Sequence, residues 1–326
     1  MRPKLSLRRA RPAHIAAGAL MLAVPGSAVA LTAGSADAQS ALQVSLDHQH
    51  LDYGQRLVVT GTASPAARGQ RLWLQFAPAG GAWRAIGSTT VGGRGRFRFV
   101  AVPTQSGAVR VLASVGAASP NGSVTDLGSV TPTTGATLIK PSEPRRVAVA
   151  ARIAAPLGAI DTLTGQSVHL SGRLLPGTAR RLIKLQYGTG RGWNTLAVTQ
   201  TRPDGRFDLG YSPGNPGQLQ VRLSFPGDRL NGHIATQIVP MTAYRASGAS
   251  WYDDSGSTAC GFHAGLGVAN RDLPCGTKVR FRYNGRSVAA VVDDRGPFVG
   301  GRDWDLNQNT AVALGFSGVD TVWASQ

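Results

Sequence analysis

Carboxyl groups crowd around one short turn near the end of the chain. Asp293 and Asp294 precede the segment Arg295-Gly296-Pro297-Phe298, and Asp305 follows Asp294 by 11 residues. Glycine and proline predict a rigid loop here. A carboxyl group can donate a proton to a substrate oxygen and take one back, which is general acid–base chemistry. The structural alternative is that Asp294 pairs with Arg295 and shapes the turn, and the motif alone leaves both interpretations open.

Strands are the elements expected to position these carboxyl groups. Residues Lys278–Tyr283 alternate apolar and polar side chains, which predicts a strand with one buried face. Asn284-Gly285 then predicts a two-residue hairpin turn, because both residues tolerate positive φ. Residues 287–292 are the expected returning strand, broken by the loop that begins at Asp294.

The end of the chain predicts one short helix. Asn307 is expected to cap it, and it should run through Leu314 and end at Gly315. A final strand is expected over 321–323. From Ala246 onward the sequence therefore predicts a compact β-barrel with one small helix.

Several motifs in this segment resemble the rare lipoprotein A (RlpA-like) family. They occur in order over about the last 80 residues: Ala249-Ser250-Trp251-Tyr252, Leu273-Pro274-Cys275-Gly276-Thr277-Lys278-Val279, Asn284-Gly285-Arg286, Asp294-Arg295-Gly296-Pro297-Phe298, Gly301-Arg302-Asp303-Trp304-Asp305-Leu306 and Ala313-Leu314-Gly315. The resemblance implies a six-stranded double-psi β-barrel, the fold of expansins and barwin-like proteins. It also implies a lytic transglycosylase acting on peptidoglycan glycan strands.

Under this resemblance Asp294 is the catalytic acid and base. A lytic transglycosylase protonates the glycosidic oxygen and then takes a proton from the sugar's own C6 hydroxyl, so one carboxyl group can serve both steps. Asp293 and Asp305 are expected to act on Asp294 as like charges, and Arg295 as an opposite charge. The alternative function is an expansin-like module that binds glycan or loosens the wall without cutting it.

Two positions depart from the family pattern. Phe262 stands where the family commonly has Glu, and Asn270 stands where it has His. The intervening loop is also shorter, so His263 is a candidate to fill part of the vacated space, with a surface position as the alternative. These departures are compatible with a slower enzyme, a different glycan or no catalysis.

Aromatic side chains are expected along a glycan groove, because their flat faces stack on pyranose rings. Tyr252, Phe298 and Trp304 are the candidates for this substrate contact. Trp251 is expected in the core, and Trp323 is expected to be buried in the final strand.

The first 38 residues predict a cleaved secretory signal. A basic head with five Lys and Arg side chains precedes a short apolar stretch that ends in small residues, including Ala28-Val29-Ala30 and Ala36-Asp37-Ala38. An uncleaved anchor is the alternative. With no Cys near these sites and no later apolar span, the mature protein is expected to be secreted or held at the cell wall without a lipid anchor or transmembrane helix.

The two cysteines of the chain, Cys260 and Cys275, both lie in the C-terminal segment. In an exported protein they predict a disulfide, which would stabilise the fold by about 3 kcal/mol for a loop of this length. Metal binding would need more ligands than two thiols, and no metal is expected. A catalytic thiol would need a partner such as His263 or Asn270.

Length, composition and charge bound the rest of the chain. Its 326 residues predict two or three domains, and 42 Gly, 19 Pro and only 16% charged residues exclude a coiled coil or helical bundle. The net charge of +17 is uneven: residues 41–244 hold 21 basic and 8 acidic side chains, whereas residues 245–326 hold 8 of each. We therefore expect residues 41–244 to form a basic region that holds an electrically neutral functional domain at residues 245–326.

The basic part contains an internal repeat. Leu74-Gln75-Phe76 matches Leu185-Gln186-Tyr187 at an offset of 111, and Gly95-Arg96-Phe97 matches Gly205-Arg206-Phe207 at an offset of 110. Alternating apolar residues between turns predict antiparallel strands. We predict a mainly β protein with two immunoglobulin-like sandwiches before the barrel.

The expected domains are the signal at 1–38, sandwiches at 41–131 and 146–243, a proline-containing linker at 132–145 and the barrel at 247–326. Glycan strands are the expected partner of the barrel, and anionic wall polymers of the basic sandwiches, with a merely solvated face as the alternative. With few aromatic residues and no recognition helix, nucleic acid is not expected. A monomer without a cofactor is expected.

Overall fold

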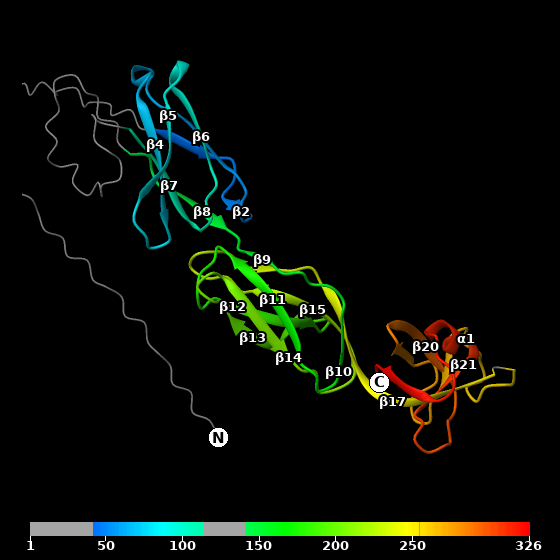
Figure 1. The fold of residues 1–326 in the computed structure, drawn as a ribbon. Coiled ribbons are helices and arrows are strands. Elements are labelled where there is room, and N and C mark those ends of the chain that lie inside the picture. Colours follow the sequence, from blue (N-terminus) through cyan, green and yellow to red (C-terminus); the bar gives the residue numbers. More distant parts are fainter. Residues whose placement is uncertain (1–41, 114–140, 254) are drawn as a thin grey trace, which may run out of the picture. The chain divides into compact units, whose positions relative to one another are not determined.

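The computed structural model describes residues 42–113, 141–253 and 255–326. The predicted signal segment at 1–38 and linker residues 132–140 lie outside these ranges. The fold is mainly β, as predicted (Figure 1). Within the described ranges, no helix is both long and apolar enough to cross a bilayer.

The first module is a sandwich of two sheets over one core. One sheet has the order β1-β3-β6 and the other β2-β8-β7-β4-β5. Inward-facing side chains of both sheets, including Val59, Phe99, Leu74 and Val111, form a single buried cluster. Its strands are β1 Gln43–Leu46, β2 His50–Leu51, β3 Leu57–Thr62, β4 Arg71–Pro78, β5 Arg84–Thr90, β6 Arg96–Ala101, β7 Gly107–Ala113 and β8 Arg145–Val149.

The last strand of this module was expected in the second sandwich. β8 pairs with β7 and with β2, so residues 145–149 belong to the first module. Val147 and Val149 point into the first core and are almost fully buried, which explains why the strand joins this sheet. The boundary predicted at residue 146 is therefore wrong.

The second module repeats the two-sheet arrangement. The sheet β14-β11-β9 faces a sheet in which β13-β12-β15-β17 are neighbours and β10 pairs with β17. Leu174, Leu185, Phe207 and Leu223 contribute to a core of its own. The strands are β9 Arg152–Ala154, β10 Ile160–Leu163, β11 Val168–Leu175, β12 Leu182–Gly188, β13 Trp193–Gln200, β14 Arg206–Tyr211, β15 Gly217–Phe225, β16 Ile234–Ala235 and β17 Val239–Tyr252.

Matched irregularities support the internal repeat. β4 has a bulge between Leu74 and Gln75, and β12 has one between Leu185 and Gln186. In the facing sheets, Gly61 and Gly172 each lie under a phenylalanine ring, where an added Cβ would come within 3 Å of the ring. The repeated sequence motifs therefore correspond to repeated packing.

The strand β17 enters the C-terminal module without interruption. Its residues 239–243 pair with β15, and Arg245–Tyr252 pair with β22 and β21. The expected boundary at 243–247 thus falls inside one strand. The pairing continues β21-β18-β20-β19-β22 and returns to β17, so the sheet closes on itself. The strands are β18 Gly267–Ala269, β19 Lys278–Tyr283, β20 Arg286–Asp294, β21 Trp304–Asn307 and β22 Asp320–Ala324.

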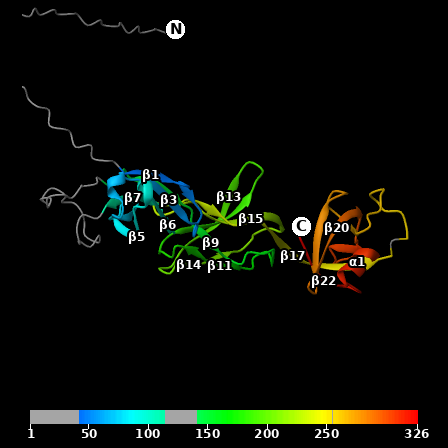
Figure 2. The same cartoon turned by 90° about the horizontal axis from the view of Figure 1, so that it is seen from above.

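The predicted hairpin and helix of this module are confirmed. Asn284 and Gly285 have φ of 45° and 81° and join β19 to β20. The helix α1 Gln308–Leu314 begins after Asn307, whose side chain accepts a hydrogen bond from the Thr310 amide, and ends at Gly315 with φ 68°. α1 contacts β20 and β21. Figure 1 labels all three elements, and Figure 2 shows α1 and β20 in the same module from above. The strand β20 runs two residues further than expected, through Asp294 itself.

Candidate functional site

Two carboxylates flank one residue of the barrel sheet. Ala269 of β18 pairs with Asp294 of β20 on one side and with Asp305 of β21 on the other. Ser250 of β17 pairs with Asp305, so four neighbouring strands contribute to one row. At about 4.8 Å per strand spacing, the Cα atoms of the two aspartates stand about 10 Å apart.

A β-bulge positions Asp294. Val268 pairs with Val292 and Ala269 pairs with Asp294, so Asp293 is an extra residue in β20. A bulge reverses the alternation of side chains beyond it and is common beside functional sites. Asp293 is consequently fully buried, whereas Asp294 is half-buried.

The Asp294 carboxylate is held by backbone donors. Its Oδ1 accepts hydrogen bonds from the Ala259 amide at 2.7 Å and from the Arg295 amide at 2.8 Å. Its carbonyl oxygen accepts from the Asn270 amide at 3.2 Å. The side chain is therefore fixed through one oxygen, and Oδ2 takes no part in either of these bonds.

Asp305 has a different environment. Its Oδ1 accepts a hydrogen bond from the Ser250 hydroxyl at 2.8 Å. Burial raises the pKa of Asp305, the Ser250 bond and the charge of Arg302 oppose this shift, and the charge of Asp294 adds to it. This electrostatic contact agrees with the two carboxylates lying on the same row.

Asp293 connects a loop to the barrel wall. Its Oδ2 accepts from the Ala264 amide at 2.8 Å, and its carbonyl oxygen accepts from the Cys260 amide at 3.3 Å. The carboxylate packs against Gly267, where a Cβ would approach Oδ2 to 2.2 Å. A glycine at position 267 leaves room for this carboxylate. The two hydrogen bonds accepted by Asp293 then hold the 260–264 segment against the barrel wall.

Arg295 ties down the facing segment. Its guanidinium donates to the carbonyl oxygens of Asn270 at 3.1 Å and Leu273 at 2.9 Å, and to the Cys275 sulfur at 3.1 Å. The positive charge of the Arg295 guanidinium is thereby directed to the 270–275 turn, while the Arg295 backbone amide donates a hydrogen bond to Asp294. These guanidinium contacts give Arg295 a positioning role that sequence reasoning missed.

The two departures from the family pattern have different environments. Asn270 is buried, and its Oδ1 accepts from the Asp272 and Leu273 amides at 3.0 and 2.8 Å. Its Nδ2 donates to the Asp303 carbonyl at 3.1 Å, so this residue organises the turn. Phe262 is 40% exposed, and the neighbouring His263 is exposed in the same loop.

The aromatic residues separate into exposed and buried sets. Phe298 is 82% exposed directly after the Asp294 loop, and Tyr252 is half-buried at the end of β17. The expectation that Trp304 contacts substrate is wrong. Its ring is 1% exposed and packs edge-on against Phe281 in the barrel core, because β21 points alternate side chains inward.

The other two tryptophan predictions also need correction. Trp251 was expected in the core, but it is 42% exposed and occupies the outward position between buried Ser250 and half-buried Tyr252 on β17. Trp323 was expected to be buried and is only half-buried, with its ring 5.9 Å from that of Tyr244. Trp323 lies between the core residues Val322 and Ala324 and so on the opposite face of β22, whereas Trp251 is exposed near the end of β17 although Ala249, two residues earlier, is in the core.

The predicted disulfide is confirmed. Cys260 and Cys275 are bonded, with their Cα atoms 5.8 Å apart. The bond joins the segment that supplies the Ala259 amide to the segment held by Arg295. Within the described residues, no cluster of His, Cys, Asp and Glu could hold a metal ion.

Comparisons with known proteins identify relatives of the C-terminal region. A family model described as lytic transglycolase matches residues 244–322. A protein of Synechocystis sp. named "Probable endolytic peptidoglycan transglycosylase RlpA" is 40% identical over 90 residues, covering 23% of this chain and 26% of its own. The endolytic peptidoglycan transglycosylase RlpA of Rickettsia typhi is 34% identical over 103 residues, covering 27% and 31%.

The C-terminal region is an RlpA-like double-psi β-barrel. The matches span only about a quarter to a third of the RlpA relatives, and the sandwiches lie outside them. Among solved structures, the D0-D1 domain of intimin aligns with 61% of this chain and 97% of its own at 12% identity, with a TM-score of 0.22 that is too low to indicate a shared fold.

Proposed function

We propose that the RlpA-like barrel cleaves peptidoglycan glycan strands as a lytic transglycosylase, with Asp294 as the acid and base. The observation that carries this proposal is the carboxylate on the bulge of β20. It is partly exposed and anchored by two backbone amides on Oδ1. A carboxyl group fixed through one oxygen can present the other oxygen to a substrate in a constant geometry.

The reaction proceeds in two proton transfers. The protonated Asp294 donates its proton to the glycosidic oxygen as the bond from that oxygen to the sugar C1 breaks. The C6 hydroxyl of the same sugar then attacks C1 and returns its proton to the Asp294 carboxylate. The product is a 1,6-anhydro sugar end, no water is consumed, and the aspartic acid is regenerated.

Asp305 supports this chemistry as the neighbouring carboxyl group. Burial raises the pKa of Asp305, and the negative charge of Asp294 adds to this shift, so the two carboxyl groups interact electrostatically. Phe298 is the first candidate to stack on a sugar ring, and its exposure immediately after the Asp294 loop supports this assignment. Tyr252 is the second candidate for this contact.

The remaining modules fit a protein of the cell wall. We infer export through the N-terminal signal and immunoglobulin-like topology for both sandwiches, which would hold the barrel at its substrate. The two-sheet arrangement over separate cores supports the second inference. Neither inference bears on the chemistry at Asp294.

The alternative is an expansin-like module that binds glycan without cleaving it. Two observations favour it: Phe262, which stands where the family commonly has Glu, is an apolar, 40% exposed side chain, and Asn270 uses its amide group to organise a turn. A barrel of this kind would bind glycan through its aromatic side chains, and the carboxyl group of Asp294 would be dispensable.

Mass spectrometry of peptide-stripped glycan strands incubated with the mature protein tests the proposal. Ends lighter by one water than reducing ends, absent with Asp294→Asn, are the expected result. The loss should be at least about 100-fold, the usual contribution of a general acid. The asparagine Oδ1 can still accept the amide bonds, so the variant should fold normally.

The other outcomes contradict the proposal in distinct ways. Reducing ends would indicate hydrolysis, with Asp305 as the second carboxylate to examine. Absence of cleavage by a folded protein that still binds intact wall would establish the binding module instead.

A further inference from the structure

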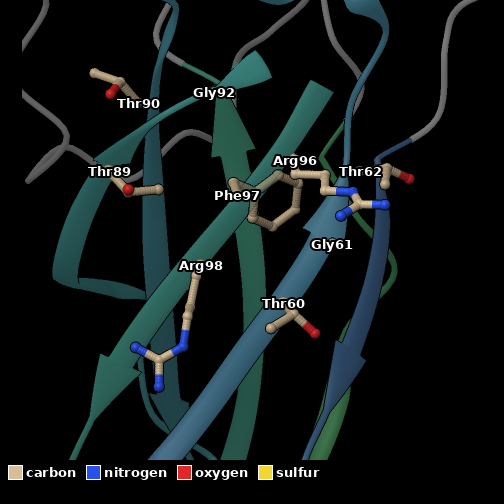
Figure 3. Close-up of a pocket in the computed structure, with 9 residues that line it drawn as sticks. All are labelled: Thr60, Gly61, Thr62, Thr89, Thr90, Gly92, Arg96, Phe97 and Arg98. Carbon is tan, nitrogen blue, oxygen red and sulfur yellow. The ribbon is translucent and has the colours of Figure 1, made fainter. Parts of the chain in front are cut away.

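The outer face of the first sandwich concentrates positive charge in a groove. Residues 42–113 contain eight arginines, no lysine, and only two acidic residues, Asp47 and Asp52. An open groove of about 560 Å³ lies over β3, β5 and β6 (Figure 3). Its lining is Thr60, Gly61, Thr62, Thr89, Thr90, Gly92, Arg96, Phe97 and Arg98.

Strand register places arginines and threonines side by side in this groove. Thr62 pairs with Arg96 and Thr60 pairs with Arg98 across the antiparallel β3–β6 ladder. Residues directly opposite project from the same face of a sheet, here the exposed one. Figure 3 shows the Arg96 side chain beside Thr62, and the Arg98 side chain extended from β6 on the other side of Thr60 from its hydroxyl.

The two groove arginines have no acidic partner among the described residues. Ion pairs of the first sandwich within those ranges are limited to His48 with Asp47. The Asp47 carboxylate is already engaged by the amides of His48 and Val58. The charge of Arg96 and Arg98 therefore faces solvent uncompensated.

The second sandwich provides an internal comparison. Its Asp208 occupies the position of Arg98, since Phe207 matches Phe97, and it pairs with His169 at 3.1 Å. Arg206, the match of Arg96, pairs with Asp204 at 3.4 Å. In the second sandwich the charges on this face are therefore paired. Arginines without an acidic partner at these positions are thus not needed for the sandwich to fold.

We propose that this groove binds a linear, hydroxyl-rich polyanion, a polyol-phosphate polymer of the cell-wall type. Guanidinium groups form bidentate hydrogen bonds with phosphate, and threonine hydroxyls can donate to or accept from polyol hydroxyls. Arg96 and Arg98 stand two residues apart on one strand, about 7 Å between Cα atoms, a spacing that successive charges of a flexible polyol phosphate can match.

Nucleic acid fits the groove less well. Single-stranded nucleic acids are bound by basic grooves that also offer aromatic platforms for the bases. The aromatic side chain in this lining is Phe97, which is only 5% exposed. The groove therefore matches the phosphates and hydroxyls of a polyol chain and lacks a surface for bases.

Titration of the mature protein with poly(glycerol phosphate) tests this site. The variant Arg96→Ser/Arg98→Ser should bind about tenfold more weakly near 0.1 M salt, and the slope of log Kd against log salt should fall by roughly 1 to 1.5. The matched control Arg202→Ser/Arg206→Ser removes the same charge from equally exposed positions in the second sandwich and should retain nearly full affinity.

Three results would overturn the proposal. These are no measurable binding, equal weakening by both double variants, or equal affinity for oligothymidylate of the same charge. Thermal melting of each variant identifies misfolding, and the control variant keeps the comparison valid. Asp294→Asn should bind the polymer normally, so failure of this site and failure of the transglycosylase proposal are distinguishable.

Discussion

The carboxyl groups beside the bulge differ in their fixed contacts. Asp294 receives two backbone amides on one oxygen, Asp293 is buried against Gly267, and Asp305 is bonded to Ser250. Three aspartates of one small region thus have three separate tasks. Among them, Asp294 is partly exposed and is held in place by two backbone hydrogen bonds, as a group that contacts a substrate must be.

Replacing Phe298 by alanine should weaken glycan binding by about 1 kcal/mol, because an aromatic face that stacks on a sugar is lost. The free energy of unfolding should change by less than about 0.5 kcal/mol, since the ring is 82% exposed. Val312→Ala on α1, exposed by 69%, is the matched control and should bind glycan normally. Unchanged affinity of the Phe298 variant would remove this ring from the substrate site.

Asp305→Asn should alter how stability depends on pH. The folded protein holds the Asp305 proton more tightly than the unfolded chain, so this residue's contribution falls as pH rises from about 4 through the raised pKa. The stability of the variant relative to wild type should therefore be greater at pH 7 than at pH 3.5. Denaturant titrations at both pH values measure this, and an equal difference would contradict it.

Residue types alone did not predict which side chains are exposed. Motifs singled out Asp294, Phe298 and the cysteines. In contrast, Trp304 was expected at the surface and is buried, and Trp251 was expected in the core and is exposed. The face of a strand residue depends on register, and a one-residue shift inverts it. Large aromatic residues give no independent signal of that register, because they are favourable both in cores and on binding surfaces.

At the scale of elements, the site depends on two loops joined by the disulfide. The segment before Cys260 supplies the Ala259 amide to Asp294, and the turn at 270–275 is held by Arg295. The Cys260–Cys275 bond connects these two segments. Loop geometry and acid geometry are therefore coupled.

The variant Cys260→Ser/Cys275→Ser should lose about 3 kcal/mol of barrel stability, the effect of opening a loop of about 15 residues. Its cleavage activity should fall while it remains folded, because the Ala259 amide is no longer restrained. Urea unfolding and the glycan assay measure the two effects. Wild-type protein treated with reductant is the control, and full activity after reduction would contradict the coupling.

Elements with local signals were predictable. The Asn284-Gly285 hairpin and the capped helix rest on residues whose side chains or φ preferences act within a few positions. The bulge at Asp293 has no such signal, since it arises where β18 and β20 meet across about 25 residues of chain. Long-range pairing likewise assigned β8 to the first sandwich, where prolines upstream had indicated a linker.

At the scale of the whole molecule, the described residues form three separate cores. One cluster belongs to each sandwich and one to the barrel. Such a chain need not unfold in a single transition. Damage to one core should therefore leave the chemistry of another intact.

Asp228→Ala should destabilise the second sandwich by about 3 kcal/mol, because it leaves the buried Arg181 without its carboxylate. Burial would raise the pKa of Asp228, but hydrogen bonds from Arg181 and two amides outweigh it and lower that pKa. This stabilisation is present above about pH 4 and is lost as pH falls through the folded pKa.

Calorimetry between pH 7 and pH 2 checks this prediction. One transition of the variant should move to lower temperature at pH 7, and the shift should shrink in acid. Asp204→Ala, which removes an exposed ion pair with Arg206, is the control and should have little effect. Glycan cleavage at temperatures below the first transition should be unchanged, and loss of cleavage there would contradict independent cores.

The unbroken strand β17 imposes a rule of parity on insertions and deletions. Its first part pairs within the second sandwich and its second part within the barrel, and the core residues Val239 and Met241 of the sandwich and Ala249 of the barrel all stand at odd-numbered positions of this strand. Adding or removing one residue near Arg245 would invert one half relative to the other unless the strand breaks or bulges. Insertions and deletions at this junction are therefore expected to add or remove an even number of residues, because only an even change keeps both sets of inward side chains facing their cores.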